Sequence, residues 1–142
     1  MPPSATFTAY APVGDALTAT YGYSQALVLH PAGFVKLSGQ GGWGADSATP
    51  SPSLPPGADE QVRLACDNVE RALAAAGVVG GWKQVINVRS YHTDIDSSFA
   101  LVGEEIRTRA PHKPLWTAVG VARLALPEMQ IEIEVEALMA GE

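Results

Sequence analysis

Cysteine, charged side chains and long apolar runs are all scarce in this sequence of 142 residues. Its single cysteine, Cys66, cannot form an internal disulfide, so we expect a reducing, cytoplasmic setting. No apolar run approaches the roughly 20 residues that span a bilayer, so we expect no membrane association. No basic side chain precedes Asp15, so neither a secretory signal nor a typical transit peptide is expected.

Positive charge is scarcer than negative charge. Lys and Arg number 9 and Asp and Glu number 15, which gives a formal net charge of −6. Because phosphate affinity comes mainly from clustered Lys and Arg, we expect no nucleic-acid partner. Only 17% of the residues are charged and 46% are hydrophobic. That balance is typical of a packed globule that hides surface by association, and the length favours a single domain over residues 1–142.

Familiar catalytic and metal-binding motifs are also missing. No CxxC, HxxxH or HExxH spacing occurs, so no metal site is indicated. The Gly-rich segment SGQGGWG lacks the GK[ST] ending of a P-loop, and no serine lies in a GxSxG elbow. His92 could serve as a base, but a lone histidine at a strand end is more often structural.

Local patterns in the first half of the chain predict a hairpin, a loop and a helix. Residues 1–10 are expected to be irregular, whereas residues 25–30 and 34–40 flank the turn sequence PAG and predict a hairpin. Residues 41–57, rich in Gly, Pro and Ser, are expected to form a surface loop. From Ala58 a helix is predicted, because apolar side chains recur every three or four residues at Val62, Ala65, Cys66, Val69, Leu73 and Ala76.

This helix carries signals at both of its ends. Asp59 is its expected N-cap, and Gly77 follows its last apolar turn as a stop. Cys66 lies on the apolar face, so we expect a buried residue and not a reactive thiol.

The second half of the chain predicts three strands and a second helix. Residues 97–110 should form the helix, capped by Asp94 or Asp96, and Pro111 and Pro114 prevent its continuation. Its buried face is expected to hold Phe99, Val102 and Ile106. Residues 82–94 alternate like a strand, with Val85, Asn87, Arg89 and Tyr91 on one side and Ile86, Val88, Ser90 and His92 on the other.

The C-terminal residues 114–140 predict two strands around a turn near Pro127. In the second of these, Ile131, Ile133 and Val135 alternate with Glu132, Glu134 and Glu136. The order β-β-loop-α-β-α-β-β predicts an α+β two-layer sandwich, with a mixed sheet of about five to six strands and two helices on one face. Since the other face is open, we expect a homo-oligomer.

Six segments occur in the order, and near the spacing, of the RidA/YjgF family. They are YSQAL at 23–27, SGQ at 38–40, DNVERALAAAG at 67–77, DI at 94–95, HKP at 112–114 and VGVARLALPEMQIEIE at 119–134. No single segment is specific, but together the six make the chain resemble that family over most of its length.

The resemblance implies a chorismate-mutase-like fold, a homotrimer and a cleft at each subunit interface. Well-studied members of the family hydrolyse reactive enamines and imines, such as 2-aminoacrylate, to the 2-oxo acid and ammonia. They do so without a metal or an organic cofactor. The resemblance therefore implies a small-molecule substrate and no cofactor. Other members have been described as ribonucleases, translation inhibitors, aminomuconate deaminases or enzymes of specialised metabolism.

Carried over residue by residue, the resemblance marks Tyr23 and Glu132 as catalytic. The glutamate positions the attacking water in deaminating members, and Gly39 lines the same cleft. One departure is important, because the family arginine that grips the substrate carboxylate is replaced here by Trp116. An indole cannot neutralise a carboxylate, so a more apolar ligand is expected.

Two further residues are candidates for substrate binding. Arg89 could supply the cation lost at Trp116, although a salt bridge with one of the strand glutamates is the more ordinary role. Trp43 could form a cleft wall or lid, and simple packing is an equal alternative. If Glu132 is buried, desolvation will raise its pKa and suit it to proton transfer.

The first functional hypothesis is a RidA-like enzyme that acts on an enamine, imine or related reactive intermediate in an inter-subunit cleft. A second is a non-catalytic ligand-binding or regulatory trimer. A third is a dedicated biosynthetic step, such as a cyclisation or dehydration in specialised metabolism. Ribonuclease action is the least favoured, given the net charge of −6.

Overall fold

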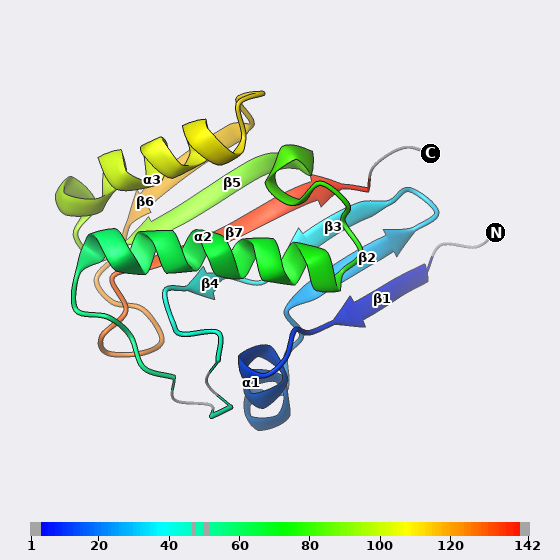
Figure 1. Cartoon of the computed structure of the whole chain (residues 1–142), viewed down its shortest axis with the longest axis horizontal. Helices are drawn as coiled ribbons and strands as arrows, with labels where there is room; N and C mark the ends of the chain where they lie inside the picture. Colours follow the sequence, from blue (N-terminus) through cyan, green and yellow to red (C-terminus); the bar gives the residue numbers. More distant parts are fainter. Residues whose placement is uncertain (1–3, 47, 50–51, 140–142) are drawn as a thin grey trace.

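The computed structural model describes residues 4–46, 48–49 and 52–139 of the chain. Within them a mixed seven-stranded sheet is covered on one face by two helices, α2 (Ala58–Ala75) and α3 (Ile95–Arg109) (Figure 1). A third helix, α1 (Val13–Tyr21), stands apart from this helical layer. The predicted α+β two-layer class is confirmed, with one helix and at least one strand more than expected.

The sheet is mostly antiparallel. Its order is β1-β2-β3-β7-β5-β6, and the short β4 also pairs with β7. Only β5 and β6 are parallel, and α3 makes the crossover between them. The strands are β1 (Ser4–Thr8), β2 (Ala26–His30), β3 (Phe34–Leu37), β4 (Gln40–Gly41), β5 (Val85–His92), β6 (Leu115–Gly120) and β7 (Ile131–Leu138).

Strand β7 shows why the alternation of its sequence matters. Ile131, Ile133 and Val135 are almost completely buried beneath the helices. Glu132 and the two glutamates that follow at alternate positions point to the opposite, open face. Because β7 lies in the middle of the sheet, this single strand carries both the centre of the core and a row of acids.

Helix α2 ends where its sequence predicts. Gly77 adopts φ +87°, and the Val78 N–H donates to the carbonyl oxygen of Leu73 over 2.9 Å. Its start differs from the expectation, because Gly57 occupies the N-cap and Asp59 lies in the first turn. Asp59 at that place still favours the helix electrostatically, through the positive end of the helix dipole.

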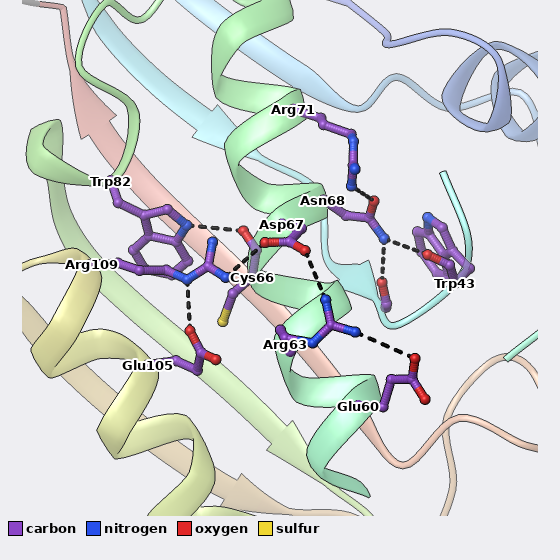
Figure 2. Close-up of polar contacts among 11 residues, drawn as sticks. Trp43, Glu60, Arg63, Cys66, Asp67, Asn68, Arg71, Trp82, Glu105 and Arg109 are labelled. Carbon is purple, nitrogen blue, oxygen red and sulfur yellow. Dashed lines mark hydrogen bonds and ion pairs between the residues drawn. The ribbon is translucent and has the colours of Figure 1, made fainter. Parts of the chain in front are cut away.

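Polar contacts tie α2 to its neighbours (Figure 2). Arg109 of α3 donates to Asp67 of α2 and to Glu105, both over 2.7 Å. The Trp82 indole N–H donates to the carbonyl oxygen of Cys66, another residue of α2, over 3.0 Å. Cys66 itself is fully buried, and burial raises the pKa of its thiol to about 12, which confirms the expectation of an unreactive core residue.

Helix α3 begins after Asp94, one of its two predicted caps. Val102 and Ile106 are buried as expected, but the prediction that Phe99 is buried was wrong. Phe99 is 48% exposed, because it lies at the rim of the helix, where its ring stacks on Trp116 with centroids 4.7 Å apart.

The N-terminal segment and β5 also differ from the predictions. Residues 4–8 form the edge strand β1, and α1 follows, whereas an irregular lead-in was expected. A shift in register between Val85 and Asn87 turns Val85 into the core and leaves Ile86 38% exposed. The predicted hairpin of β2 and β3 is confirmed, with Gly33 at φ +71° in its turn.

The predicted loop over residues 41–57 begins one residue later than expected, since Gly41 still belongs to β4. Positions 47, 50 and 51 of that segment lie outside the described residues. The two C-terminal strands are present, but they are not neighbours, because β5 lies between β6 and β7.

Candidate functional site

A pocket of about 380 Å³ opens beside the first half of β7. Helix α1 forms one wall, and the segment that leads into β7 forms another. Its lining residues are Leu17, Tyr21, Tyr23, Ser38, Gly39, Trp43, Ala125, Leu126, Met129 and Glu132. Four of the predicted site residues, Tyr23, Gly39, Trp43 and Glu132, therefore line one pocket. We call it the Glu132 pocket.

Glu132 reaches this pocket from the open face of β7. Its backbone is paired with Gly41 of β4 on one side and with Tyr91 of β5 on the other. The side chain lies against the backbone of Gly39, where an added Cβ would be 2.6 Å from Cδ of the glutamate. A side chain at position 39 would therefore displace the carboxylate.

The three glutamates of β7 have different electrostatic environments. Burial raises the pKa of Glu132, and repulsion from Glu134 raises it further. Within the described part of the chain, the Glu132 carboxylate makes no hydrogen bond or ion pair. The carboxylate of Glu134 instead accepts a hydrogen bond from the Tyr91 hydroxyl, which raises the pKa of that tyrosine.

Glu136 is the most stabilised anion of the three. The side-chain amide of Asn87 donates to it over 2.8 Å, and this bond lowers the pKa of its carboxyl. Lys36 and Arg89 lie 3.6 and 3.7 Å away and lower the pKa further. Of the three glutamates, Glu132 is therefore the one whose surroundings favour exchange of a proton.

The position of Trp43 is fixed by a chain of buried hydrogen bonds. Its indole N–H donates to the Tyr10 hydroxyl over 3.1 Å, and that hydroxyl donates to Oε1 of Gln40 over 2.7 Å. Gln40 in turn donates to Gln25 over 2.9 Å. Asn68 of α2 also donates to the carbonyl oxygen of Trp43, as Figure 2 shows. Trp43 is 3% exposed, so it serves both as pocket wall and as packed core.

Trp116 and Arg89 do not lie in the Glu132 pocket. Trp116 is paired with Val88 and points to the helix-covered face, whereas Glu132 points to the open face. It lines a separate pocket of about 300 Å³ beside α3. Arg89 lies on the open face, where it forms the ion pair with Glu136 that was the more ordinary of its two expected roles.

The indole of Trp116 is held by a buried chain of hydrogen bonds that includes His92. The Trp116 N–H donates to Oγ of Ser90 over 2.8 Å. Because an indole can only donate, the Ser90 hydroxyl is free to donate to Nε2 of His92, 2.8 Å away. Nδ1 of His92 then donates to Ser98, 2.6 Å away, whose hydroxyl donates to the carbonyl oxygen of Asp94 over 3.0 Å. Burial lowers the pKa of His92, so this histidine is a neutral structural residue.

Several lining residues were missed by the sequence reasoning. Leu17 and Tyr21 belong to α1, which was not predicted. A signal for that helix is present, because Pro12 precedes it and Gly22 ends it in the left-handed conformation, with φ +74°. The other missed residues are Ser38, Ala125, Leu126 and Met129, which come from irregular segments without a periodic pattern.

In the described ranges, no group of three or more His, Cys, Asp or Glu side chains could hold a metal ion. None of the described helices has the length and apolar character needed to cross a membrane.

These features define a small two-layer α+β protein with an acid-bearing pocket beside its central strand. Comparison with known proteins gives the family. The model of the endoribonuclease L-PSP family matches residues 13–139. The RutC family protein YjgH of Escherichia coli (strain K12) is 39% identical over 133 residues, which cover 89% of this chain and 92% of YjgH.

Solved structures agree with this match. A protein named YJGH is 34% identical with a TM-score of 0.74, and the alignment covers 96% of this chain and 98% of that one. Rv2704 of Mycobacterium tuberculosis, described as a member of the YjgF/YER057c/UK114 family, is 27% identical with a TM-score of 0.74, over 96% of this chain and 100% of that one. The chain therefore belongs to the RidA/YjgF (L-PSP) family, as its sequence predicted.

Proposed function

We propose that this protein is a homotrimeric enzyme that hydrolyses an enamine or imine in the Glu132 pocket. One observation carries the proposal: a carboxyl with a raised pKa and no partner among the described residues lies in a largely apolar pocket. Such a group can both accept a proton from water and return it, because its pKa lies closer to neutrality than that of an ordinary glutamate. The single cysteine favours a reducing, cytoplasmic setting.

The proposed reaction needs one base and one acid, and Glu132 serves as both. As carboxylate it accepts a proton from a water molecule while the water oxygen attacks the carbon of the C=N bond. As carboxylic acid it then returns the proton to nitrogen. This gives a carbinolamine. The Glu132 carboxylate next takes the hydroxyl proton of the carbinolamine and passes it to nitrogen as the C–N bond breaks. A carbonyl compound and ammonia leave, so that imine plus water gives carbonyl plus ammonia. An enamine first takes a proton on carbon from the same acid.

Tyr23 and Ser38 supply further polar groups of the pocket. The Ser38 hydroxyl donates to the carbonyl oxygen of Ser24 over 2.8 Å, so it can accept a hydrogen bond from the attacking water. The Tyr23 hydroxyl is suited to hold that water beside the carboxylate, and the apolar walls keep bulk water away from the intermediate. A pocket that only binds a ligand would need no titratable acid without a partner. That difference separates the enzyme from the non-catalytic trimer.

The expected substrate differs from the family's usual 2-imino acids. Trp116 takes the place of the arginine that grips a carboxylate in deaminating relatives. Arg89 is already engaged by Glu136, so it is a poor replacement for that cation. Enzymatically generated 2-aminoacrylate should therefore be turned over weakly or not at all.

Trimerisation is supported by the open face of the sheet. Large apolar side chains are exposed on strands of that face, and the most exposed of them, Leu115, is 72% accessible. Phe7 is 65% accessible, and Leu29, Val119 and Leu138 are 37%, 37% and 42% accessible. Burial of such a surface between identical subunits would stabilise an oligomer through the hydrophobic effect.

The description of the matching family model suggests another activity, the cleavage of RNA. The net charge of −6 and the row of glutamates on the open face weigh against it, because both repel a phosphate backbone.

The decisive experiment compares Glu132→Gln with Glu136→Gln. An imine is generated in situ by an oxidase, and its loss is followed through the decrease of its semicarbazone. Glu132→Gln should lower kcat by a factor on the order of 10²–10⁴, because it removes the base without changing the shape of the side chain. Glu136→Gln, on the same strand but outside the pocket, should keep the activity. Full activity of Glu132→Gln would contradict the proposal.

A further inference from the structure

Helix α1 forms an apolar wall of the Glu132 pocket. Leu17 is 3% exposed and Tyr21 is 56% exposed, and both line the pocket together with Gly39 and Glu132. Figure 1 shows α1 apart from the layer of α2 and α3, although its Val13 and Leu17 belong to the buried core. The helix is placed where it limits what the pocket can hold.

This wall is firmly attached to the sheet. Residue Tyr10, which precedes α1, belongs to the buried hydrogen-bond chain of Gln40 and Trp43. The Asp15 N–H donates to the carbonyl oxygen of Tyr10 over 3.1 Å. An added Cβ at Gly14 would lie 3.2 Å from both Gln25 and the Tyr10 ring, so the helix packs closely against them. Fixed apolar walls discriminate between ligands by shape and polarity.

The charges of the pocket also favour an uncharged ligand. Of the described residues that line it, none is Lys or Arg, and its one acid is Glu132. Glu134 lies close enough to raise the pKa of Glu132 by repulsion. A substrate carboxylate would add a further negative charge here, and the described lining residues of this chain include no guanidinium to receive it. A neutral substituent meets no such penalty and gains by contact with Leu17 and Tyr21.

We infer that the pocket selects imines and enamines whose carbon substituents are apolar and uncharged, and that Leu17 and Tyr21 are specificity-determining residues. This inference rests on the proposed function for its chemistry. The reaction it assigns is R–CH=NH plus water to R–CHO plus ammonia, with R an aliphatic group. A 2-imino acid, which differs by its carboxylate, is the disfavoured substrate.

A matched pair of imines tests the selectivity. A flavin monoamine oxidase acting on isobutylamine releases the imine of isobutyraldehyde, and an L-amino-acid oxidase acting on valine releases the same skeleton with a carboxylate. Acceleration of hydrolysis is followed for both through the decrease of the semicarbazone. We expect kcat/KM to be about tenfold or more higher for the neutral imine. A preference for the carboxylate imine would overturn the inference.

Variants of α1 test the role of its two residues. Leu17→Ala and Tyr21→Ser should raise KM for the neutral imine with little change in kcat, because they remove apolar contact and leave Glu132 in place. Tyr21→Arg should shift the preference towards the carboxylate imine.

Ala19→Ser, on an exposed position of α1 outside the pocket, is the control. If Leu17→Ala does not fold, the Tyr21 variants still decide, because Tyr21 is largely exposed. If both Tyr21 variants keep the KM and the preference for the neutral imine over the carboxylate imine, the proposed role of α1 in specificity is wrong.

Binding separates a failure of this inference from a failure of the proposed function. The probes are 3-methylbutan-2-one and 3-methyl-2-oxobutanoate, observed by saturation-transfer NMR. Binding of the neutral ketone alone, without turnover of either imine, supports the selectivity and contradicts the enzymatic proposal. Turnover with preference for the carboxylate supports the enzyme and overturns the selectivity. If neither ketone binds and neither imine is hydrolysed, both are wrong.

Discussion

The side chain of Glu132 lies directly against the α-carbon of Gly39. An added Cβ at position 39 would be 2.6 Å from Cδ and 2.7 Å from Cγ of the glutamate, far inside van der Waals contact. The two residues are more than ninety positions apart in the chain, and they meet because β4 pairs with β7 immediately beyond Gly39. The place of the acid in the pocket therefore depends on the absence of a side chain in the short segment between β3 and β4.

Gly39→Ala should impair activity more than stability. The new methyl group forces the Glu132 carboxylate to another rotamer, and misplacement of a reacting group by about 1 Å can lower the rate on the order of 100-fold. The measurement is kcat/KM for the neutral imine, together with urea denaturation. Gly44→Ala is the matched control, because an added Cβ there meets nothing within 4 Å. Equal activity of the two variants would contradict the proposed position of the acid.

Glu134→Gln should move the acid limb of the pH–rate profile to lower pH. Repulsion from Glu134 contributes to the raised pKa of Glu132, so its removal lowers the pH at which the Glu132 carboxylate forms. Activity that depends on the carboxylate should then persist further into the acid range than in the wild type. Glu136→Gln should leave the limb in place, because Glu136 does not contribute to that pKa. An unshifted limb in Glu134→Gln would show that another group controls the profile.

The stability of the protein should fall as the pH drops below about 6.5. Burial lowers the pKa of His92 below its ordinary value of 6.5, so the unfolded state binds the proton first. The contribution of neutral His92 is complete above 6.5 and is lost as the pH falls towards the pKa of the folded state. Urea denaturation between pH 5 and 8 measures this trend. His92→Gln, which does not titrate, should show a weaker slope than the wild type over this range.

Ser90→Ala should destabilise the fold by about 1–3 kcal/mol, because it leaves the Trp116 N–H and Nε2 of His92 without their partner. Tryptophan fluorescence reports the change around the indole, and urea denaturation gives the free energy of unfolding. Ser97→Ala is the matched control. Its hydroxyl is exposed and bonds only the carbonyl oxygen of Asp94, so the cost should stay below about 0.5 kcal/mol.

Leu115→Asp should break the proposed trimer. Light scattering of the wild type should give three times the chain mass of 14.9 kDa, and the variant should give a lower mass, because a charge would be buried between subunits. Val79→Asp changes a side chain that is equally exposed, at 77%, but lies after α2 and not on the open face. It should keep the mass of the wild type. A wild-type mass of one chain would contradict the trimer.

The elements that the sequence predicts well are those with a strong local pattern. In helix α2, the β2–β3 hairpin and strand β7, apolar residues recur at the spacing of a helix or a strand, and turn or stop residues mark the ends. These local signals along the chain suffice to predict the three elements. Strand β1 and helix α1 have weaker patterns. Four of the five residues of β1 are exposed, and among the described strands it pairs with β2 alone. Such an edge strand exists because of its partner and not because of its own sequence.

The candidate site, like the fold, was predicted only in part. The resemblance marked Tyr23, Gly39 and Glu132, and the structure brings these three together with Trp43 in one pocket. It does not place Trp116 there, because the parallel pairing of β6 with β5 turns that side chain to the helix-covered face. The apolar wall of α1 had no counterpart in the sequence reasoning, since its helix was not expected.

The sequence by itself determined that the three glutamates of β7 share one face, because side-chain alternation is a property of a single extended strand. Only the tertiary structure decided which of them is an acid with a raised pKa. Tyr91 binds Glu134, and Asn87 with two cations binds Glu136, while Glu132 is buried beside Gly39 without such a partner among the described residues. Those partners come from other strands, and a pKa depends on what surrounds the carboxyl in space.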